Sequence, residues 1–403
     1  MSTGSPAPDR SRVPLWRDIR VLRVGGQAIA LLLVFLLLRW LLGNLTSNLD
    51  RLNIGFDFGF LTRPTQFKIP YHSTFDDRSP VWQMVVVGIK NTFLAGFFGI
   101  LLALTLGLVV GVSRLSKNWL VARLATVYVE FFRNIPPLLI IIFFAAALFT
   151  YGPFPNLREA ILIDAPGTSS TLLILSNDQW GIPGFTGGER WALFAALLGA
   201  GLILAITAWL WRTRVNENTG RPHHRVAWFF GVLVGIGIVG YLVLGGPFTI
   251  SWPGQSENRR LIVGGFALNW GFMSVAAALG LYTASHVGEI IRGSILAVPR
   301  GQTEASTALA LSGFQRYRFV VLPQALRIAI PPIINQCLNL VKNTSLGTAV
   351  AYAEITALTQ TSIGNGRPAL QSLLVMMAVY LMFSLAISLL LNIVNRRLQL
   401  VTR

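Results

Sequence analysis

Residues 304–323 read EASTALALSGFQRYRFVVLP and lie between two long apolar segments. They carry Arg316 and Arg318, and charged side chains are expensive inside a bilayer. The first half is rich in helix formers, and Gly313 is placed to end or bend that helix, because Gly commonly follows a helix terminus. Pro323 marks the end of the segment, since Pro disfavours helix in the residue before it. The pattern indicates a short amphipathic element on a membrane surface, although a plain connecting loop is equally compatible with it.

The composition around this stretch is that of a membrane protein. The chain has 403 residues, of which 53% are hydrophobic and 12% charged, against about 25% charged in soluble domains. Its mean hydropathy is +0.60, and a helical span needs about 20 mostly apolar residues. We therefore predict an all-α, polytopic membrane helical bundle. Eight transmembrane helices are expected, at residues 24–42, 83–112, 125–150, 190–211, 226–246, 267–291, 327–348 and 371–394.

The net charge of +17 is accounted for by its distribution along the chain. With an even number of spans both termini share a side, and placing them in the cytoplasm puts 20 of the 33 Lys and Arg there, against nine outside. This is the positive-inside bias of membrane proteins. A nucleic-acid partner would need a basic patch with interleaved aromatic residues, and the sequence shows none. We therefore expect membrane lipid, and not nucleic acid, to surround the protein.

The stretch resembles the EAA loop of ABC-importer permeases, in which Glu-Ala-Ala is followed by a Gly and later by a hydrophobic residue and Leu-Pro. Matching residues are Glu304, Ala305, Val320, Leu322 and Pro323. The flanks GLYTASHVGEIIRGSILAVPRGQ and VKNTSLGTAVAYAEIT also match, and together they resemble permeases for polar or general L-amino acids. Two positions depart from the pattern. Ser306 replaces the second Ala, and Ala310 stands where Gly is expected, with Gly313 three residues later.

The resemblance implies a transport subunit and not an enzyme. Its fold would be the permease core of an ABC type I importer in a bacterial inner membrane, with both termini cytoplasmic. Residues 299–326 would dock on a separate ABC ATPase dimer, which would bind the ATP and Mg, so that this chain carries no cofactor. A periplasmic amino-acid-binding protein would deliver the substrate. Family members work in pairs, and the long insertion favours a related but distinct second permease subunit over a second copy.

The expected organisation follows from the spans and from the extent of the resemblance. A cytoplasmic N-terminal tail, a first span with its periplasmic loop, and a first part of the permease core precede an insertion with two extra spans. The second part of the core contains the EAA loop and is followed by a short cytoplasmic tail. The boundaries are 1–23, 24–81, 82–150, 151–265, 266–395 and 396–403.

Polar residues within the predicted spans are candidates for the substrate pathway. Residues 342–345 place four polar groups in a row, one of them charged, and such residues face a bundle interior or a cavity. An amino acid offers a carboxylate to a Lys and an ammonium to amide or hydroxyl oxygens. Interhelical hydrogen bonding is the structural alternative. The candidates are Lys342, Asn343, Thr344, Ser345, Asn91 and Thr92.

A second set of charged residues suggests a structural or gating role. Glu130 and Arg133 are three residues apart, so they share a helix face and are expected to pair. Pro136 and its neighbour Pro137 must kink or break the third span. Glu289 and Arg292 lead from the sixth span into the central loop.

Motifs that other functions would require are missing from the sequence. No G-x-x-x-x-G-K-[ST] phosphate loop occurs, and neither a catalytic constellation nor metal-ligand spacing is found. An ion-coupled secondary transporter of small polar solutes remains the alternative. It predicts internal repeats with buried ion-binding carboxylates, and no clear repeat is visible. A non-transporting membrane scaffold would not explain the polar run at 342–345.

Overall fold

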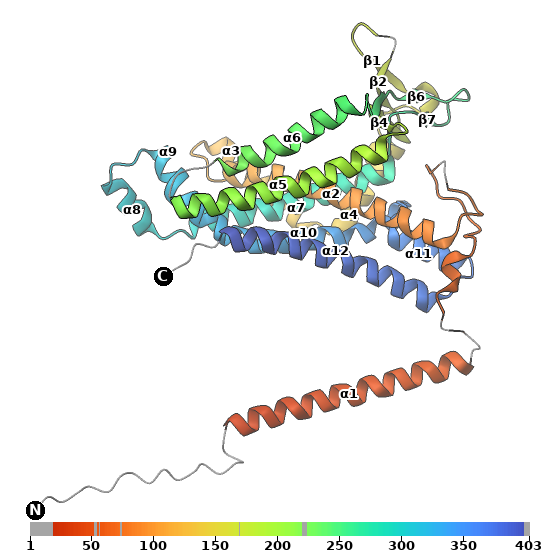
Figure 1. The fold of residues 1–403 in the computed structure, drawn as a ribbon, viewed down its shortest axis with the longest axis horizontal. Helices are drawn as coiled ribbons and strands as arrows, with labels where there is room; N and C mark the ends of the chain where they lie inside the picture. Colours follow the sequence, from red (N-terminus) through yellow and green to blue (C-terminus); the bar gives the residue numbers. More distant parts are fainter. Residues whose placement is uncertain are drawn as a thin grey trace, which may run out of the picture.

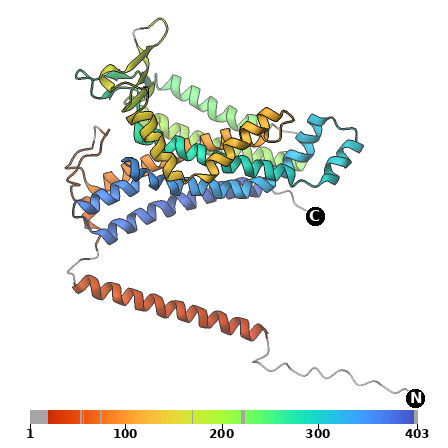
Figure 2. The same ribbon diagram turned by 180° about the vertical axis from the view of Figure 1, so that it is seen from behind.

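Most of the long helices run side by side as one bundle (Figures 1 and 2). The computed structural model describes residues 19–51, 55, 57–72, 75–168, 170–219 and 224–398. Short strands gather at one end of the bundle, the strand end, while α8 (Arg300–Ala308) and α9 (Gly313–Arg316) project from the other, the α8–α9 end. The predicted terminal tails lie largely outside the described residues.

The first helix, α1 (Ile19–Arg51), lies apart from the bundle in every view (Figure 1). It contains the apolar span Leu22–Asn48, none of which is buried, and is thus longer than the predicted span 24–42. Its exposed apolar side chains suit a helix surrounded by lipid. The loop after it, with η1 (Gly59–Thr62), returns to the strand end and packs there through Phe60.

The centre of the bundle is the contact between α2 (Val81–Ser113) and α7 (Trp270–Leu296). Glycines on α2 let the two backbones approach closely. A Cβ at Gly111 would lie 2.7 Å from the carbonyl oxygen of Gly288, and one at Gly107 would lie 2.6 Å from Val287 Cγ1. Small residues are the usual device for close helix packing in lipid.

Three further helices complete this core. α10 (Leu322–Asn343) runs into the 3-10 helix η5 (Thr344–Val350), and α11 (Ile355–Gly364) and α12 (Ala369–Leu398) follow. Val341, Ile355, Val379 and Phe383 form one buried cluster between these helices. The only cysteine, Cys337, is buried on α10.

The third predicted span is broken, as its two prolines require. α3 (Trp119–Asn134) and α4 (Pro137–Phe144) meet at an angle of 103°, and the π-helix η2 (Ala145–Thr150) continues α4. Proline suits the first turn of α4, where the missing N–H would have no partner in any case. The segment starts near the α8–α9 end and leads to the strand end (Figure 1).

Residues 151–189, the first part of the 151–265 insertion, contribute four short strands. A four-stranded antiparallel sheet has the order β1-β2-β3-β8, and β4–β5 and β6–β7 form two separate pairs. The elements are η3 (Leu157–Glu159), β1 (Ile161–Asp164), β2 (Thr171–Leu175), β3 (Gln179–Ile182), β4 (Gly184–Gly187), β5 (Phe248–Ser251), β6 (Gly254–Gln255), β7 (Ile262–Val263) and β8 (Phe266–Asn269).

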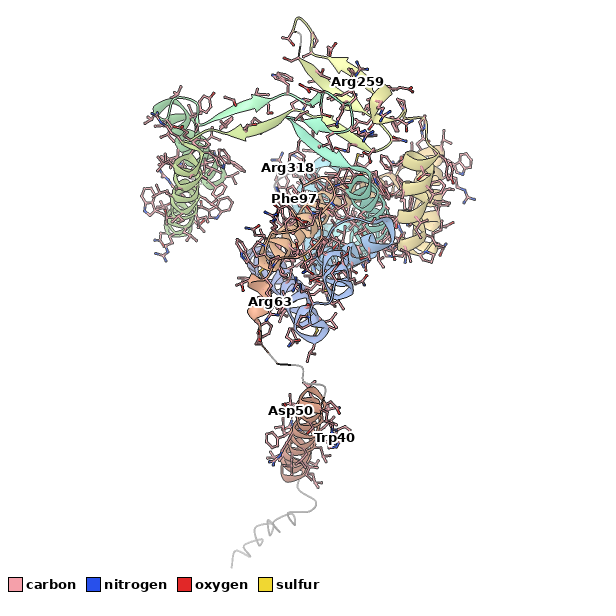
Figure 3. The ribbon with its side chains drawn as sticks, turned by 90° about the vertical axis from the view of Figure 1, so that its right-hand side faces the viewer. Trp40, Asp50, Arg63, Phe97, Arg259 and Arg318 are labelled. Carbon is pink, nitrogen blue, oxygen red and sulfur yellow. The ribbon has the colours of Figure 1, made fainter. Side chains whose placement is uncertain are left out.

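Between β4 and β5 the chain forms a hairpin of two apolar helices, α5 (Trp191–Thr219) and α6 (Arg225–Val243). The two pack mainly against each other. Figure 3 shows the pair, in green, beside the bundle and joined to it through the strands. These are the two extra helices expected in the 151–265 insertion.

The count of spans agrees with the predicted helical membrane bundle. Six described helices are long and apolar enough to cross a membrane, and the bent α3–α4 pair makes a seventh. The remaining predicted span is α7, which has 27 residues. It is less apolar than the others because its small and polar residues face neighbouring helices and not lipid. Ser274, Thr283 and Ser285, for example, are buried.

The segment between α7 and α10 turns at Ala310, not at Gly313 as predicted. Ala310 has φ +56°, the left-handed conformation that ends many helices. The N–H of Leu311 donates to the carbonyl of Ser306 at 3.1 Å, and that of Ala310 to the carbonyl of Thr307 at 2.9 Å. This is the hydrogen-bond pattern of a Schellman motif. The short polar turn is closed by backbone bonds, so Ala can occupy the position at some cost.

Gly313 begins the next helix. Ser312 caps α9 through a reciprocal pair of bonds with Gln315, and the π-helix η4 (Tyr317–Val321) then leads into α10. Pro323 was expected to mark the end of the segment, but α10 follows η4 without a break and the helix runs through this position. The segment is therefore a helical hairpin whose second arm continues into a span.

The close packing of α2 against α7 can be tested by a substitution that adds one methyl group. Gly107→Ala places a Cβ 2.6 Å from Val287 Cγ1, and overpacking of this kind costs about 1–3 kcal/mol. We expect a lower thermal midpoint in detergent, measured with a thiol-reactive dye that reports exposure of Cys337. Gly235→Ala on α6, where nothing lies within 4 Å, is the matched control and should not lower the midpoint. Equal midpoints for both variants would contradict the packing described here.

The turn at Ala310 generates a second prediction. An L-residue in the left-handed region costs about 1–2 kcal/mol, and Gly does not incur this cost. Ala310→Gly should therefore slow amide hydrogen exchange in peptides covering residues 300–316, by roughly fivefold or more. Ala308→Gly, inside α8, should speed it, since Gly weakens a helix. Faster exchange in the Ala310→Gly protein would exclude a strained turn at this position.

Candidate functional site

The projecting hairpin at the α8–α9 end presents an exposed surface. Glu304 and Ala305 are exposed on α8, whereas Ser306 is buried and donates its hydroxyl to the carbonyl of Thr303 at 2.7 Å. Leu309 and Phe314 are 74% and 72% exposed. Large apolar side chains at the tip of a polar hairpin are typical of a protein-docking surface.

The hairpin is held by its base and by two side-chain contacts. Val298, Val321 and Ala325 form a small buried cluster where its two arms meet α7 and α10. Arg316 donates to Thr307 Oγ1 at 3.2 Å across the turn, and Leu322 is partly exposed beside Pro323. The predicted coupling residues thus lie on one hairpin, with Ser306 supporting it from inside and Ala310 and Gly313 shaping its turn. The hairpin is joined to α7 at one end and continues into α10 at the other.

The four polar residues at the end of α10 divide into two kinds. Thr344 is buried and donates to the carbonyl of Val341 at 2.7 Å, and Ser345 donates to the carbonyl of Lys342 at 2.9 Å. These hydroxyls are thus used within their own helix. Lys342 is exposed and Asn343 half-buried, and Lys342 takes no part in the ion pairs of the described residues. The polar groups of these two residues remain available to a ligand.

Asn91 and Thr92 lie elsewhere, on the buried face of α2 near the strand end. Asn91 Nδ2 donates to the carbonyl of Ala353 at 2.7 Å, and Thr92 Oγ1 accepts from the N–H of Ile355 at 3.2 Å. Tyr352 donates its hydroxyl to the carbonyl of Asn91 at 2.7 Å. Asn91 and Thr92 thus attach α2 to the link between η5 and α11.

Glu354 is a buried carboxylate that the sequence reasoning missed. It caps α11 by accepting from the N–H groups of Thr356 at 2.9 Å and Ala357 at 2.8 Å, and its oxygens also accept from Thr348 at 3.2 Å and Tyr380 at 2.9 Å. Burial raises the pKa of this carboxyl, and the four donors partly offset that effect. A Glu directly before an apolar helical stretch is the only signal the sequence offers, because Tyr380 comes from another helix.

The charged residues at the α8–α9 end pair differently from the prediction. No ion pair joins Glu130 to Arg133 within the described ranges. Instead Glu289 pairs with Arg292 at 2.6 Å and with Arg114 at the end of α2. Glu130 and Arg133 lie one turn apart on α3, but both ion pairs of the described residues belong to Glu289.

These charges surround a cavity of about 370 Å³. Glu130 and Arg133 from α3 line one side, and Glu289 and His286 from α7 line the other. The Arg114–Glu289 pair joins the ends of the two central helices. Pro136 stands at the nearby break between α3 and α4.

Comparison with known proteins agrees with this architecture. The family model described as "Binding-protein-dependent transport system inner membrane component" matches residues 226–400. The chain is 37% identical over 371 residues to the general L-amino acid transport system permease protein AapQ of Rhizobium johnstonii, covering 90% of this chain and 89% of that one.

Two further relatives match nearly the whole chain. The putative amino-acid ABC transporter permease protein YhdX of Escherichia coli is 33% identical, with 94% of each chain covered. The glutamate/glutamine/aspartate/asparagine transport system permease protein BztB of Rhodobacter capsulatus is 35% identical, with 96% of each covered. Matches of this identity and extent include the strands and the α5–α6 hairpin as well as the core. The chain therefore belongs to the family of amino-acid ABC transporter permeases.

Proposed function

We propose that this chain is the transmembrane permease of an ATP-driven importer that moves L-amino acids across the inner membrane by alternating access. The main support for this proposal is the exposed hairpin at the α8–α9 end. It presents a surface suited to docking and connects α7 with α10 in the core. The names of the relatives support amino acids as the substrate class. Both termini lie in the cytoplasm, on the side of the hairpin.

The partners follow from the parts this chain would need. An ABC ATPase dimer binds ATP and Mg and docks on residues 299–326. A periplasmic amino-acid-binding protein delivers substrate at the strand end, and a second, related permease completes the pathway. Closure of the ATPase dimer moves the hairpin, and α7 and α10 carry that movement into the bundle. Such a step requires two bundle arrangements that partner binding can bias.

The ion-coupled alternative finds no support in the buried carboxylates. Glu354 is fully buried, but four donors already occupy its oxygens. Glu289 is committed to two arginines. A coupling cation would need oxygens that are free to coordinate it.

Coupling through the hairpin can be tested by copurification with the candidate ATPase. Glu304→Lys reverses a charge on the exposed face of α8, so we expect ATPase binding to be lost while the permease still inserts in the membrane. Glu257→Lys makes the same change on an exposed residue at the strand end and should bind normally. Equal ATPase recovery with both variants would remove the hairpin from the coupling surface.

The substrate pathway at the end of α10 generates a separate test. Lys342→Met or Asn343→Ala removes a polar group that has no partner in its own helix, so we expect ATP-dependent uptake to fall about tenfold in assembled transporter. Lys117→Met, on the exposed turn between α2 and α3, controls for the loss of one positive charge. Unchanged uptake and affinity in both pathway variants would show that the run at 342–345 only packs helices.

A further inference from the structure

A second polar cavity opens at the strand end, at the opposite end of α2 from the hairpin. Its volume is about 210 Å³, below the roughly 300–1,000 Å³ typical of sites for drug-sized ligands. Five separate parts of the chain meet around it: the loop before α2, α2 itself, β8, the start of α7 and the link between η5 and α11. Lining residues with polar side chains are Tyr71, His72, Lys90, Asn91, Asn269 and Tyr352.

The only charged side chain that the lining of this cavity contributes is a lysine. Lys90 lines it, is exposed, and takes no part in the ion pairs of the described residues. The lining includes neither Asp nor Glu. The side-chain amide of Asn269 adds a neutral donor, whereas the amide N–H groups of Asn91 are directed at Ala353 and His72. A ligand group with negative charge is the one that this lining complements.

His72 adds a neutral donor. Burial, and then the charge of Lys90, lower the pKa of His72, so the ring is neutral near pH 7. Asn91 Nδ2 lies 3.3 Å from His72 Nε2 and also donates to the carbonyl of Ala353. Because an amide nitrogen only donates, Nε2 accepts, and the single proton of the neutral ring is on Nδ1. That N–H has no other hydrogen bond within the described residues.

The backbone beside His72 is held in an unfavourable conformation. Tyr71 has φ +64°, and its hydroxyl donates to Asp178 Oδ1 at 2.5 Å. Asp178 lies just before β3, so this bond ties the loop to the sheet. Strained residues that their surroundings hold in place cluster at binding sites. The strain here positions His72 at the cavity.

Aromatic walls and a short connection complete the site. Phe266, Phe272 and Tyr352 line the cavity and give it aromatic walls. The N–H of Tyr352 donates to the carbonyl of Gly347 at 3.0 Å. Gly347 belongs to η5, which begins at Thr344, directly after Lys342 and Asn343. The cavity and the polar run are thus ends of one connected segment.

We propose that this cavity is a binding site for the carboxylate of a single amino acid, with Lys90 as its charged ligand and His72 and the Asn269 amide as neutral ones. This proposal rests on the proposed importer function. It adds a site where the substrate is held before it reaches the polar residues at 342–345. The site binds the carboxylate of the amino acid and not its ammonium group, because no acidic side chain lines the cavity.

The test uses the assembled transporter in proteoliposomes without binding protein or ATP. An equimolar mixture of ¹⁴C-labelled L-amino acids is the probe, because all of them share the α-carboxylate. We expect binding by the wild type, and about tenfold weaker binding by Lys90→Met. Lys90→Arg, which retains the charge, should bind more tightly than Lys90→Met. Lys68→Met, an exposed change in the same loop region but outside the cavity, should bind as the wild type does.

Competition on the wild-type protein tests the site without any variant. N-acetylglycine retains the carboxylate and should displace the bound label, whereas glycinamide retains only the ammonium and should not. Displacement by glycinamide alone, or equal binding by Lys90→Met and wild type, would overturn the carboxylate site. Absence of wild-type binding would overturn it as well.

The two proposals fail in distinguishable ways. Adding binding protein and ATP to the same proteoliposomes measures ATP-dependent uptake, which reports the importer function directly. Uptake by the wild type together with unaltered binding by Lys90→Met leaves the importer intact and removes this site. Carboxylate-selective binding without ATP-dependent uptake leaves the site and removes the importer.

Discussion

The close approach of α2 to α7 is the constraint on which the other contacts depend. Helices in lipid gain little from the hydrophobic effect and associate through packing, so a stripe of glycines is a direct way to fix one pair. Around Gly107 and Gly111 the two backbones nearly touch. α3, α4 and α10 all pack against α7. Both functional ends of the molecule are therefore positioned relative to a single helix pair.

This central pair also connects the two ends. At the α8–α9 end α7 leads into the hairpin, and Glu289 ties it to the end of α2 through Arg114. At the strand end Asn91 of α2 is bonded to the link between η5 and α11. A rigid shift of α7 against α2 would alter the contacts at both ends. Coupling of this kind needs two discrete packings of one interface, with no specialised path of residues.

Apolar length was enough to predict the helical spans, because lipid allows few alternatives for a buried backbone. It could not predict the strands, since β3 pairs with β8 only after the α5–α6 hairpin has returned the chain. Local sequence rules were also insufficient at two places in the bundle. Glu289, and not Glu130, forms the ion pairs of the described residues, with Arg292 on its own helix and with Arg114 from α2. The turn lies at Ala310 because backbone bonds close it there, although Gly313 is the better residue for the conformation.

The polar side chains of the bundle fall into two groups, those that already have hydrogen-bond or ion-pair partners and those that do not. Glu354, Thr92 and Thr344 are buried, and hydrogen bonds satisfy them, so removing any of them would leave donors or acceptors unpaired and destabilise the fold. Lys90 and Lys342 are exposed, and both are absent from the ion pairs of the described chain. A lysine within a span carries a large desolvation cost and gives the fold no ion pair in return. For that reason we propose that a ligand, and not the protein, supplies the partner of each of these two lysines.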